Sequence, residues 1–295
     1  MEVKLEVKKM PTKILDGKII AAEISQQLKK RIIQQKLSPR LAIILCGEDP
    51  ASVLYITMKK KACEEIGIQS ELHTFPETIS ASEICSHINR LQKEADGIII
   101  QLPLPVSLEK HKFSILNSID PAKDVDGLTA TSLGKIAQGN LEGIFVSATV
   151  QGIISLLDTY KIQFQGKNVT IINHSALIGK PLSLLLLQRG ATVTICHEFT
   201  PDLSAKTNNA DILISATGVP GLIKKEMVKQ GAVVVDVGIS KNASTGKVQG
   251  DVDFYGVQDI ANFIAPVPGG VGPMTIAQLL LNVVESSLRR SVVRS

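Results

Sequence analysis

A chain of 295 residues with 44% hydrophobic and 20% charged residues is long enough for about two globular domains, each with a core of its own. A net charge of only +4, with 3% aromatic residues and no tryptophan, argues against a nucleic-acid partner. The four cysteines form no CxxC pair, no apolar run reaches the roughly 20 residues of a membrane span, and "MEVKLEVKKM" lacks an apolar signal core. We therefore expect a soluble cytoplasmic protein with reduced thiols and no membrane partner.

The first half of the chain predicts alternating helices and strands. Apolar residues recur every four positions in its first helix, at Ile20, Ile24, Leu28 and Ile32. "LAIILCG" predicts a buried strand, a helix follows from about 51 to 66, and "IQSELHTF" alternates like a strand. Ser80 and Glu83 form a capping box ahead of a helix that runs through Leu91. "DGIIIQLPLP" is a further short strand, and its prolines end it.

The second half repeats this alternation more regularly. Strands are predicted at 168–172, 191–196, 211–217 and 232–238, and helical segments at 180–189, about 202–208 and 224–230. This order predicts a small, doubly wound, mostly parallel sheet. A long amphipathic helix, "PMTIAQLLLNVVESSLRR", ends the chain with basic residues that complement its dipole.

The stretch "TIINHSALIGKPLS", residues 170–183, is typical of the first turn of a dinucleotide-binding unit. A β-branched run ends in a polar turn, and Gly179 and Pro181 open an apolar helix. Asn173 stands where a first glycine is usual. Because asparagine tolerates a left-handed backbone, we expect Asn173 to make the turn at modest strain.

Tyr55 and Lys59 lie four residues apart, so on a helix they share a face. They are either a surface lysine beside a half-buried tyrosine, or part of a site. Lysines relay protons where burial or a polar partner lowers the pKa of the amine toward neutrality.

Gln101 is predicted at the carboxyl end of a strand, the edge where open α/β sheets bind ligands, although it can equally be a glutamine that merely ends the strand. In "DPAKDVDG", Asp124 and Asp126 could together bind a cation. With no other acidic cluster nearby, we favour a single aspartate that accepts hydrogen bonds from an amino-substituted heterocycle, and no metal. The loop "APVPGGVGPMT", residues 265–275, has three glycines and three prolines, so its shape is fixed and a ligand can approach its backbone closely.

Tyr55 with Lys59, "QLPLP", "KDVDG" and "PVPGGVGPMT", in this order and spacing, closely resemble the bifunctional methylenetetrahydrofolate dehydrogenase/methenyltetrahydrofolate cyclohydrolase family. The resemblance runs from about residue 14 to the last helix. It implies two α/β domains with a cleft between them, where folate meets a nicotinamide cofactor, and a role in one-carbon metabolism and purine biosynthesis. It further implies a folate/catalytic domain at 1–147 plus 276–295, a Rossmann-like NAD(P)-binding domain at 148–275, and a homodimer through the nucleotide domains.

The resemblance also implies roles for particular residues. Lys59 would relay protons in the cyclohydrolase step, Gln101 would hydrogen-bond to it, Tyr55 would stack on the folate, and Asp126 would pair with the pterin's amino edge. The implied folate-binding set is Ser52, Tyr55, Lys59, Gln101, Leu102, Asp126, Pro268, Gly269 and Gly270. The implied cofactor-binding set is Thr149, Asn173, His174, Ser175, Glu198, Gly218, Gly238 and Ile239.

Three departures from the family pattern affect the cofactor side. The turn commonly reads Gly-Arg/Ala-Ser, but here it is Asn173, His174 and Ser175. Glu198 replaces a serine or arginine; its carboxylate would repel the 2′-phosphate of NADP and favour NAD, unless a protonated His174 opposes it or Glu198 points into water. "FVSATVQG", residues 145–152, lacks the two prolines of the family's Pro-Cys-Thr-Pro.

The family favours NADP, while Glu198 leaves NAD open. The altered 145–152 segment is expected to loosen the connection between the domains. Two alternatives to a bifunctional enzyme therefore stay open: a cyclohydrolase with weak or lost dehydrogenase activity, and a non-catalytic folate-binding relative.

Overall fold

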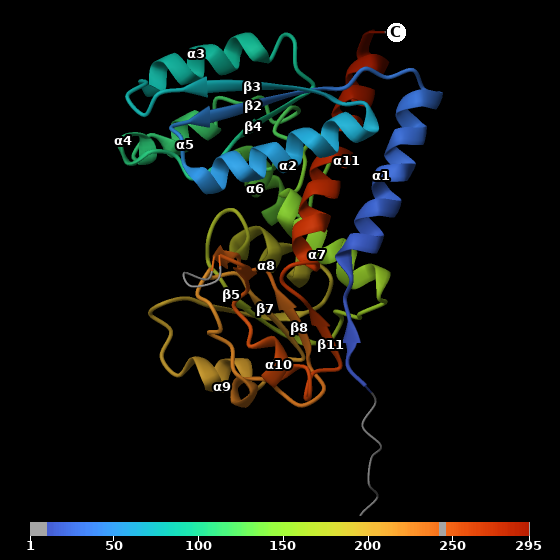
Figure 1. The fold of residues 1–295 in the computed structure, drawn as a ribbon, viewed down its shortest axis with the longest axis vertical. Helices are drawn as coiled ribbons and strands as arrows, with labels where there is room; N and C mark the ends of the chain where they lie inside the picture. The colour runs from blue at the N-terminus through green and yellow to red at the C-terminus, as the bar shows by residue number, and fades with distance from the viewer. Residues whose placement is uncertain (1–10, 242–245, 295) are drawn as a thin grey trace, which may run out of the picture.

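The computed structural model describes residues 11–241 and 246–294, so the charged N-terminal segment 1–10 lies outside the described residues. Two parallel sheets lie one above the other along the long axis of the molecule, and the C-terminal helix α11 (Val271–Arg294) runs from above the lower sheet up through the upper half (Figure 1). The predicted α/β class with a doubly wound second sheet is confirmed.

The upper sheet in Figure 1 has the strand order β3-β2-β4 and is parallel throughout. Its strands are β2 (Arg40–Cys46), β3 (Gln69–Phe75) and β4 (Gly97–Ile100). Strands β2 and β4 are buried almost continuously because helices cover both faces of the sheet. Its longer helices are α1 (Gly17–Gln34), α2 (Pro50–Ile66) and α3 (Ala81–Leu91), and the shorter ones are α4 (Val106–Glu109), α5 (Lys112–Leu116) and α6 (Ala130–Ala137). The predicted capping box at Ser80 and Glu83 is present.

The lower sheet has the order β1-β11-β8-β7-β5-β6 and is also parallel. Its strands are β1 (Lys13–Ile14), β5 (Asn168–Ile172), β6 (Thr192–Cys196), β7 (Ile212–Ser215), β8 (Val233–Asp236) and β11 (Phe263–Ala265). Strands β9 (Ser240–Lys241) and β10 (Val248–Gln249) form a separate, short antiparallel sheet. Helices of this half are α7 (Ala148–Thr159), α8 (Gly179–Gln188), α9 (Leu203–Thr207) and α10 (Phe254–Val257).

Two of the differences from the predicted elements concern the lower half; the helices α4 to α7 were also not predicted. The helix predicted at 224–230 is only a 3₁₀ turn, η1 (Lys225–Met227). The preceding Ile223 forms a β-bridge with Val252, which holds the chain extended and leaves room for one turn. In addition, the N-terminal strand β1 pairs with β11, so the chain begins in the lower sheet before it enters α1 (Figure 1).

Helix α11 joins the two halves through their cores. Its first turns place Val271, Met274 and Ala277 in the core above the lower sheet. Its later turns place Leu279 to Val284 among the side chains of α1, α2 and β2. Gly152 lets α7 approach α11 closely, since a Cβ there would lie 3.2 Å from the Met274 carbonyl carbon.

Candidate functional site

Lys59 and Gln101 meet at the carboxyl end of the upper sheet. Helix α2 presents Lys59 one turn after Tyr55, and Gln101 directly follows β4. The Lys59 Nζ donates to Gln101 Oε1 at 3.1 Å, and Gln101 Nε2 donates to the Leu102 carbonyl at 2.9 Å. Since the backbone fixes one end of the Gln101 amide, its oxygen is held toward the lysine. Gln101 is 9% exposed, and both ends of its amide are hydrogen-bonded.

Asp126 belongs to the same cluster through its charge. Burial raises the pKa of Asp126, the nearby Lys59 cation lowers it, and the Asp124 charge raises it again. Asp126 therefore lies within electrostatic range of the Lys59 side chain, which the Gln101 amide holds. This group of three residues, Lys59, Gln101 and Asp126, is called the lysine cluster below.

Asp124 has a different task from Asp126. Its oxygens accept hydrogen bonds from the backbone NH groups of Leu128 and Thr129 at 2.9 and 2.8 Å, and from Ser132 Oγ at 2.9 Å. With its acceptor sites used to brace the loop, Asp124 is poorly suited to share a cation with Asp126. Within residues 11–241 and 246–294, no group of three or more His, Cys, Asp or Glu side chains has the arrangement of a metal site.

Ser52 and Tyr55 lie on the same helix as the lysine. The Ser52 side chain is buried, and its hydroxyl oxygen has no hydrogen-bond partner among the described residues. Burial raises the pKa of Tyr55, so its phenol stays neutral, and the residue is half-buried.

The glycine loop before α11 is held by the start of α1. Gly17 NH donates to the Gly269 carbonyl at 2.9 Å. A Cβ on Gly17 would lie 1.9 Å from the Gly270 carbonyl oxygen, so only glycine fits there. Gly269 has a φ of +119°, which also requires glycine. The predicted set Pro268, Gly269 and Gly270 thus lies on a loop of fixed shape, although no described contact joins it to the lysine cluster.

The nucleotide turn after β5 is built differently from the prediction. Asn173 does not adopt a left-handed backbone: apart from glycines, the described residues with positive φ are Lys36, Lys161 and Asp202. Instead, the side chain of Asn173 holds the turn with its own hydrogen bonds. Its Oδ1 accepts from Ser175 NH, Ser175 Oγ and Gly179 NH at 2.9, 2.7 and 3.0 Å, and its Nδ2 donates to the Ala216 carbonyl at 2.7 Å. Asparagine therefore organises the turn through hydrogen bonds rather than through unusual φ.

Glycine is still required where the turn meets α8. A Cβ on Gly179 would lie 2.0 Å from the Asn173 carbonyl oxygen. The start of this ten-residue helix thus packs directly onto the turn. Such a helix N-terminus suits a pyrophosphate, which agrees with the predicted cofactor position.

His174 and Glu198 come together at the ends of β5 and β6. His174 Nδ1 lies 3.8 Å from Glu198 Oε2, and both side chains are exposed. The His174 ring also lies 5.2 Å from the ring of His197, centroid to centroid. Glu198 therefore faces a histidine from the nucleotide turn as well as solvent.

Thr149 lies in the first turn of α7, while Gly218 and Ile239 lie in loops after β7 and β8. Thr149 Oγ1 accepts from Thr275 Oγ1 at 3.4 Å, which links α7 to α11. The space around Gly218 is open, and its nearest neighbour is the Ile239 carbonyl, 4.0 Å from an added Cβ. Gly218 has a φ of +73°, so its conformation favours glycine.

Two buried aspartates behind these loops were missed by the sequence predictions. Asp236 ends β8, and Asp251 follows β10; their exposed fractions are 3% and 0%. The available signal was an acidic residue inside the apolar run "VVVDVG" and in "GDVD". Buried carboxylates are rare unless they are hydrogen-bonded.

Burial raises the pKa of Asp236 from 3.8 to about 6. Hydrogen bonds from nearby backbone NH groups lower this pKa, and the charge of Asp251 raises it further. Because its pKa is raised, the folded state binds the proton of Asp236 more tightly than the unfolded state does. Its contribution to stability is therefore complete below pH 3.8 and is lost as the pH rises through about 6. The loss corresponds to about 3 kcal/mol. We expect the free energy of unfolding of the wild type, minus that of Asp236→Asn, to fall by about this amount between roughly pH 4 and 7.

Chemical denaturation of both proteins across this pH range measures the difference, because the asparagine amide does not titrate. Loss of hydrogen bonds in the variant shifts the whole curve but not its slope with pH. A difference that stays level or rises with pH would contradict the assignment.

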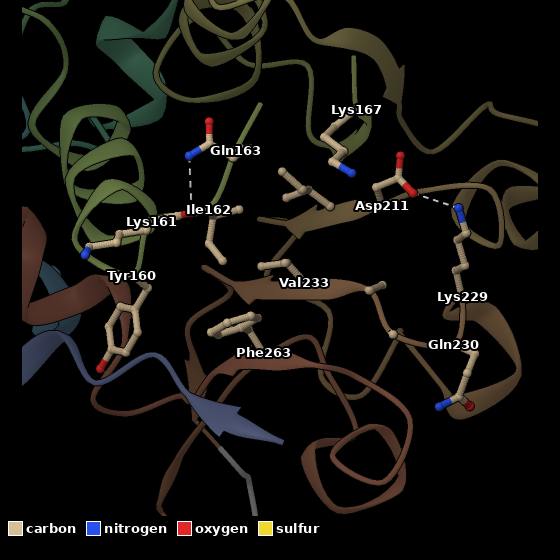
Figure 2. Close-up of a pocket in the computed structure, with 13 residues that line it drawn as sticks. Tyr160, Lys161, Ile162, Gln163, Lys167, Asp211, Lys229, Gln230, Val233 and Phe263 are labelled. Atoms are coloured by element: carbon tan, nitrogen blue, oxygen red, sulfur yellow. Dashed lines mark hydrogen bonds and ion pairs between the residues drawn. The ribbon is translucent and has the colours of Figure 1, made fainter. Parts of the chain in front are cut away.

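A cavity of about 330 Å³ lies at the opposite edge of the lower sheet (Figure 2). It opens between the amino ends of β7, β8 and β11, with Ile212, Val233 and Phe263 among its lining residues. Its rim carries an ion pair between Lys229 and Asp211 at 2.7 Å. None of the predicted site residues lines this cavity, so it is separate from the candidate site.

The fold and these residues define a class of protein: an α/β enzyme with a Rossmann-like nucleotide sheet and a lysine cluster at the carboxyl end of a second parallel sheet. Two family descriptions match the chain. "Tetrahydrofolate dehydrogenase/cyclohydrolase, catalytic domain" matches residues 15–126, and "Tetrahydrofolate dehydrogenase/cyclohydrolase, NAD(P)-binding domain" matches residues 147–291. The chain belongs to the tetrahydrofolate dehydrogenase/cyclohydrolase family, a family of bifunctional enzymes.

Individual relatives are similar over almost their whole length. The chain is 47% identical to the bifunctional protein FolD of Hydrogenobaculum sp., with 94% of this chain and 99% of the relative covered. The crystal structure of the Campylobacter jejuni bifunctional enzyme FolD superposes with a TM-score of 0.90 at 43% identity, covering 95% and 99% of the two chains. The Trypanosoma brucei dehydrogenase-cyclohydrolase, solved with NADP cofactor and an inhibitor, has a TM-score of 0.90 at 31% identity, covering 96% and 99%.

Proposed function

We propose that this chain oxidises methylenetetrahydrofolate to methenyltetrahydrofolate with a nicotinamide cofactor and then hydrolyses the methenyl compound to formyltetrahydrofolate. The observation that carries the proposal is the Lys59–Gln101 hydrogen bond of 3.1 Å at the carboxyl end of β4, with Asp126 beside it. A lysine held by an amide, with a carboxyl group in electrostatic range, has no evident structural task on a helix surface. It is suited to proton transfer at a bound substrate.

The hydrolysis step explains why the lysine is needed. Water attacks the methenyl carbon, which is electrophilic, and a ring nitrogen must accept a proton as the ring opens. In its neutral form Lys59 takes a proton from the attacking water, and in its charged form it gives one to that nitrogen. Gln101 fixes the position of the amine, while Asp126 accepts hydrogen bonds from the pterin's amino edge.

The oxidation step requires alignment more than acid or base catalysis. A bound nicotinamide supplies the acceptor for the hydride that leaves the methylene carbon. The chain's own residues fit such a cofactor: the Asn173 turn and the N-terminus of α8 suit its pyrophosphate, while Gly218, Gly238 and Ile239 bring backbone close to it. Tyr55 stacks on the folate ring, and the loop with Pro268, Gly269 and Gly270 lines the other side of the substrate.

We propose NADP as the cofactor, with NAD as a usable alternative because of Glu198. A relative at 31% identity was solved with NADP, which supports the first part. The second part rests on Glu198, whose carboxylate would repel a 2′-phosphate. His174, 3.8 Å away, would offset that repulsion when protonated and so favours NADP.

Replacing Glu198 with serine is expected to raise the ratio of kcat/KM for NADP to that for NAD by about tenfold, because one repulsive charge is removed near the ribose. Steady-state oxidation of methylenetetrahydrofolate with each cofactor gives this ratio. Asp202→Ser is a matched control, since Asp202 caps the start of α9 and lies outside the predicted cofactor set. An unchanged ratio in Glu198→Ser would mean that the carboxylate does not face the ribose.

The remaining parts of the proposal concern organisation and setting. We propose a cytoplasmic homodimer that acts in one-carbon metabolism and purine biosynthesis, joined through the nucleotide domains. Exposed apolar side chains at Val219 and Val248 support a contact on that half, and light scattering of the purified protein measures its mass in solution. In the described part of the chain, no helix is long and apolar enough to cross a membrane.

We further propose that the chain divides into a folate/catalytic domain, 1–147 plus 276–295, and a nucleotide domain, 148–275. Strand β1 belongs to the first of these by sequence but pairs with β11 in the lower sheet.

A steady-state assay tests the whole proposal. Purified protein is mixed with methylenetetrahydrofolate and either NADP or NAD, and methenyl and formyl products are measured. We expect saturable oxidation with at least one cofactor. Hydrolysis without oxidation would favour the cyclohydrolase alternative, and folate binding without either reaction would favour a non-catalytic relative.

A further inference from the structure

The carboxylates of Asp236 and Asp251 lie together behind the loops that follow β7 and β8. Both side chains are almost inaccessible to solvent. The proposed chemistry uses neither of them. Burying a carboxylate costs free energy unless its oxygens accept hydrogen bonds. The segments that these hydrogen bonds connect therefore indicate what the two aspartates do.

Asp251 joins its own segment to the loop after β7. Its Oδ2 accepts three hydrogen bonds: from Ser215 Oγ at 2.7 Å, from Thr217 NH at 2.6 Å and from Thr217 Oγ1 at 2.9 Å. Thr217 Oγ1 in turn accepts from Val219 NH at 3.1 Å. The conformation of residues 215–219, which include Gly218, is thus held by one buried carboxylate.

Asp236 makes the corresponding connection for the loop after β8. Its Oδ1 accepts from Gly238 NH and from Asp251 NH, both at 3.0 Å, and its Oδ2 accepts from Val252 NH at 2.9 Å. Residues 236–238 and 250–252 are therefore fastened to one another. Together the two aspartates connect three loops in series.

Two glycines make room for the pair in a reciprocal way. A Cβ on Gly238 would lie 1.8 Å from Asp251 Oδ1, and a Cβ on Gly250 would lie 1.9 Å from Asp236 Oδ2. Neither glycine has a positive φ, so each is needed for space rather than for conformation. Among the described residues, Asp251 Oδ1 accepts no hydrogen bond and lies against Gly238.

We propose that Asp251 is a positioning residue for the nicotinamide cofactor, whose carboxylate fixes the loop 215–219 against the loop 236–239 and so sets the distance between the backbone at Gly218 and at Gly238. This inference rests on the proposed function for the identity of the ligand. Asp251 itself is buried and does not touch the cofactor. Asp236 supports it by holding the backbone NH of Asp251.

The two activities separate positioning from general stability. Hydrolysis of methenyltetrahydrofolate uses the lysine cluster in the upper half and needs no cofactor. Loosening the loops of the lower half should therefore weaken cofactor binding and leave hydrolysis intact. A residue with a merely structural role would lower both activities as the folded fraction falls.

The test compares Asp251→Ala and Asp251→Asn with the wild type. Alanine removes all three acceptor contacts, so we expect the cofactor KM to rise at least about tenfold, with hydrolysis within about twofold of the wild type. Asparagine keeps an oxygen facing Ser215 and Thr217 without the charge, so it should restore most of the affinity. Asp259→Asn, at an exposed position in the same region, is the matched control and should change neither activity.

Titration with the reduced cofactor, followed by its fluorescence, gives the Kd even if oxidation is absent. A wild type that binds the cofactor but does not oxidise methylenetetrahydrofolate would count against the proposed function and leave the positioning role to be judged by Kd alone. Should Asp251→Ala fail to fold, Asp251→Asn decides, with an expected rise in Kd of about two- to fivefold and unchanged hydrolysis. Folded variants with wild-type Kd, or equal losses in hydrolysis and in cofactor binding, would overturn the inference.

Discussion

Replacing Lys59 with alanine is expected to lower the rate of methenyltetrahydrofolate hydrolysis by a factor of about 10² to 10⁴, the usual contribution of a positioned acid or base. Lys59 Nζ is the charged end of the lysine cluster, and Gln101 Oε1 holds it at 3.1 Å. Alanine cannot transfer a proton, and a water molecule in its place would lack the fixed position. Stopped-flow or steady-state hydrolysis, with the folate concentration varied, gives the rate.

Folate binding should survive this change, because in the proposed site the ring would be held mainly by Tyr55, Asp126 and the loop with Pro268, Gly269 and Gly270. We therefore expect kcat to fall far more than the affinity for folate. Lys60→Ala is the matched control, since Lys60 is exposed on the same helix. Near-normal hydrolysis in Lys59→Ala would remove the assigned role.

Replacing Asn173 with alanine is expected to raise the cofactor KM of the dehydrogenase by at least about tenfold. The Asn173 side chain makes four hydrogen bonds, to Ser175 NH, Ser175 Oγ, Gly179 NH and the Ala216 carbonyl. At about 0.5–1.5 kcal/mol for each, their loss exceeds what a tenfold change in affinity requires. The turn would open, and the N-terminus of α8 would lose its register with the phosphates.

The same variant should still hydrolyse methenyltetrahydrofolate, since the lysine cluster lies on the other sheet. Asn209→Ala is a suitable control: Asn209 is exposed, and its side chain bonds only to the Ala205 carbonyl in the preceding helix. Thermal unfolding of both variants checks that the fold is retained. An Asn173→Ala enzyme with the wild-type KM for cofactor would show that the turn does not contact the nucleotide.

The parts of the fold that depend on local patterns could be predicted from sequence. The strand at 168–172 has the predicted bounds because a β-branched run is buried on both faces. The capping box at Ser80 likewise depends on residues three apart. By contrast, the pairing of β1 with β11 joins residues about 250 positions apart, and no local pattern in "TKILDG" predicts it.

The candidate site could be predicted only in part, for the same reason. The resemblance named Lys59 and Gln101, and the structure places their side chains in contact. The prediction for Asn173 was wrong about its backbone, because one partner of its side chain, the carbonyl of Ala216, becomes a neighbour only when β5 pairs with β7. Asp236 and Asp251 were missed since a lone acidic residue at a strand end gives no sign of the glycine that makes room for it.

Hydrolysis of methenyltetrahydrofolate by the wild-type protein, with no nicotinamide cofactor present, tests most directly whether the lysine cluster is a catalytic site. We expect the enzyme to hydrolyse the compound saturably and well above the rate in buffer. A rate equal to that of buffer, from folded protein that binds folate, would contradict the account.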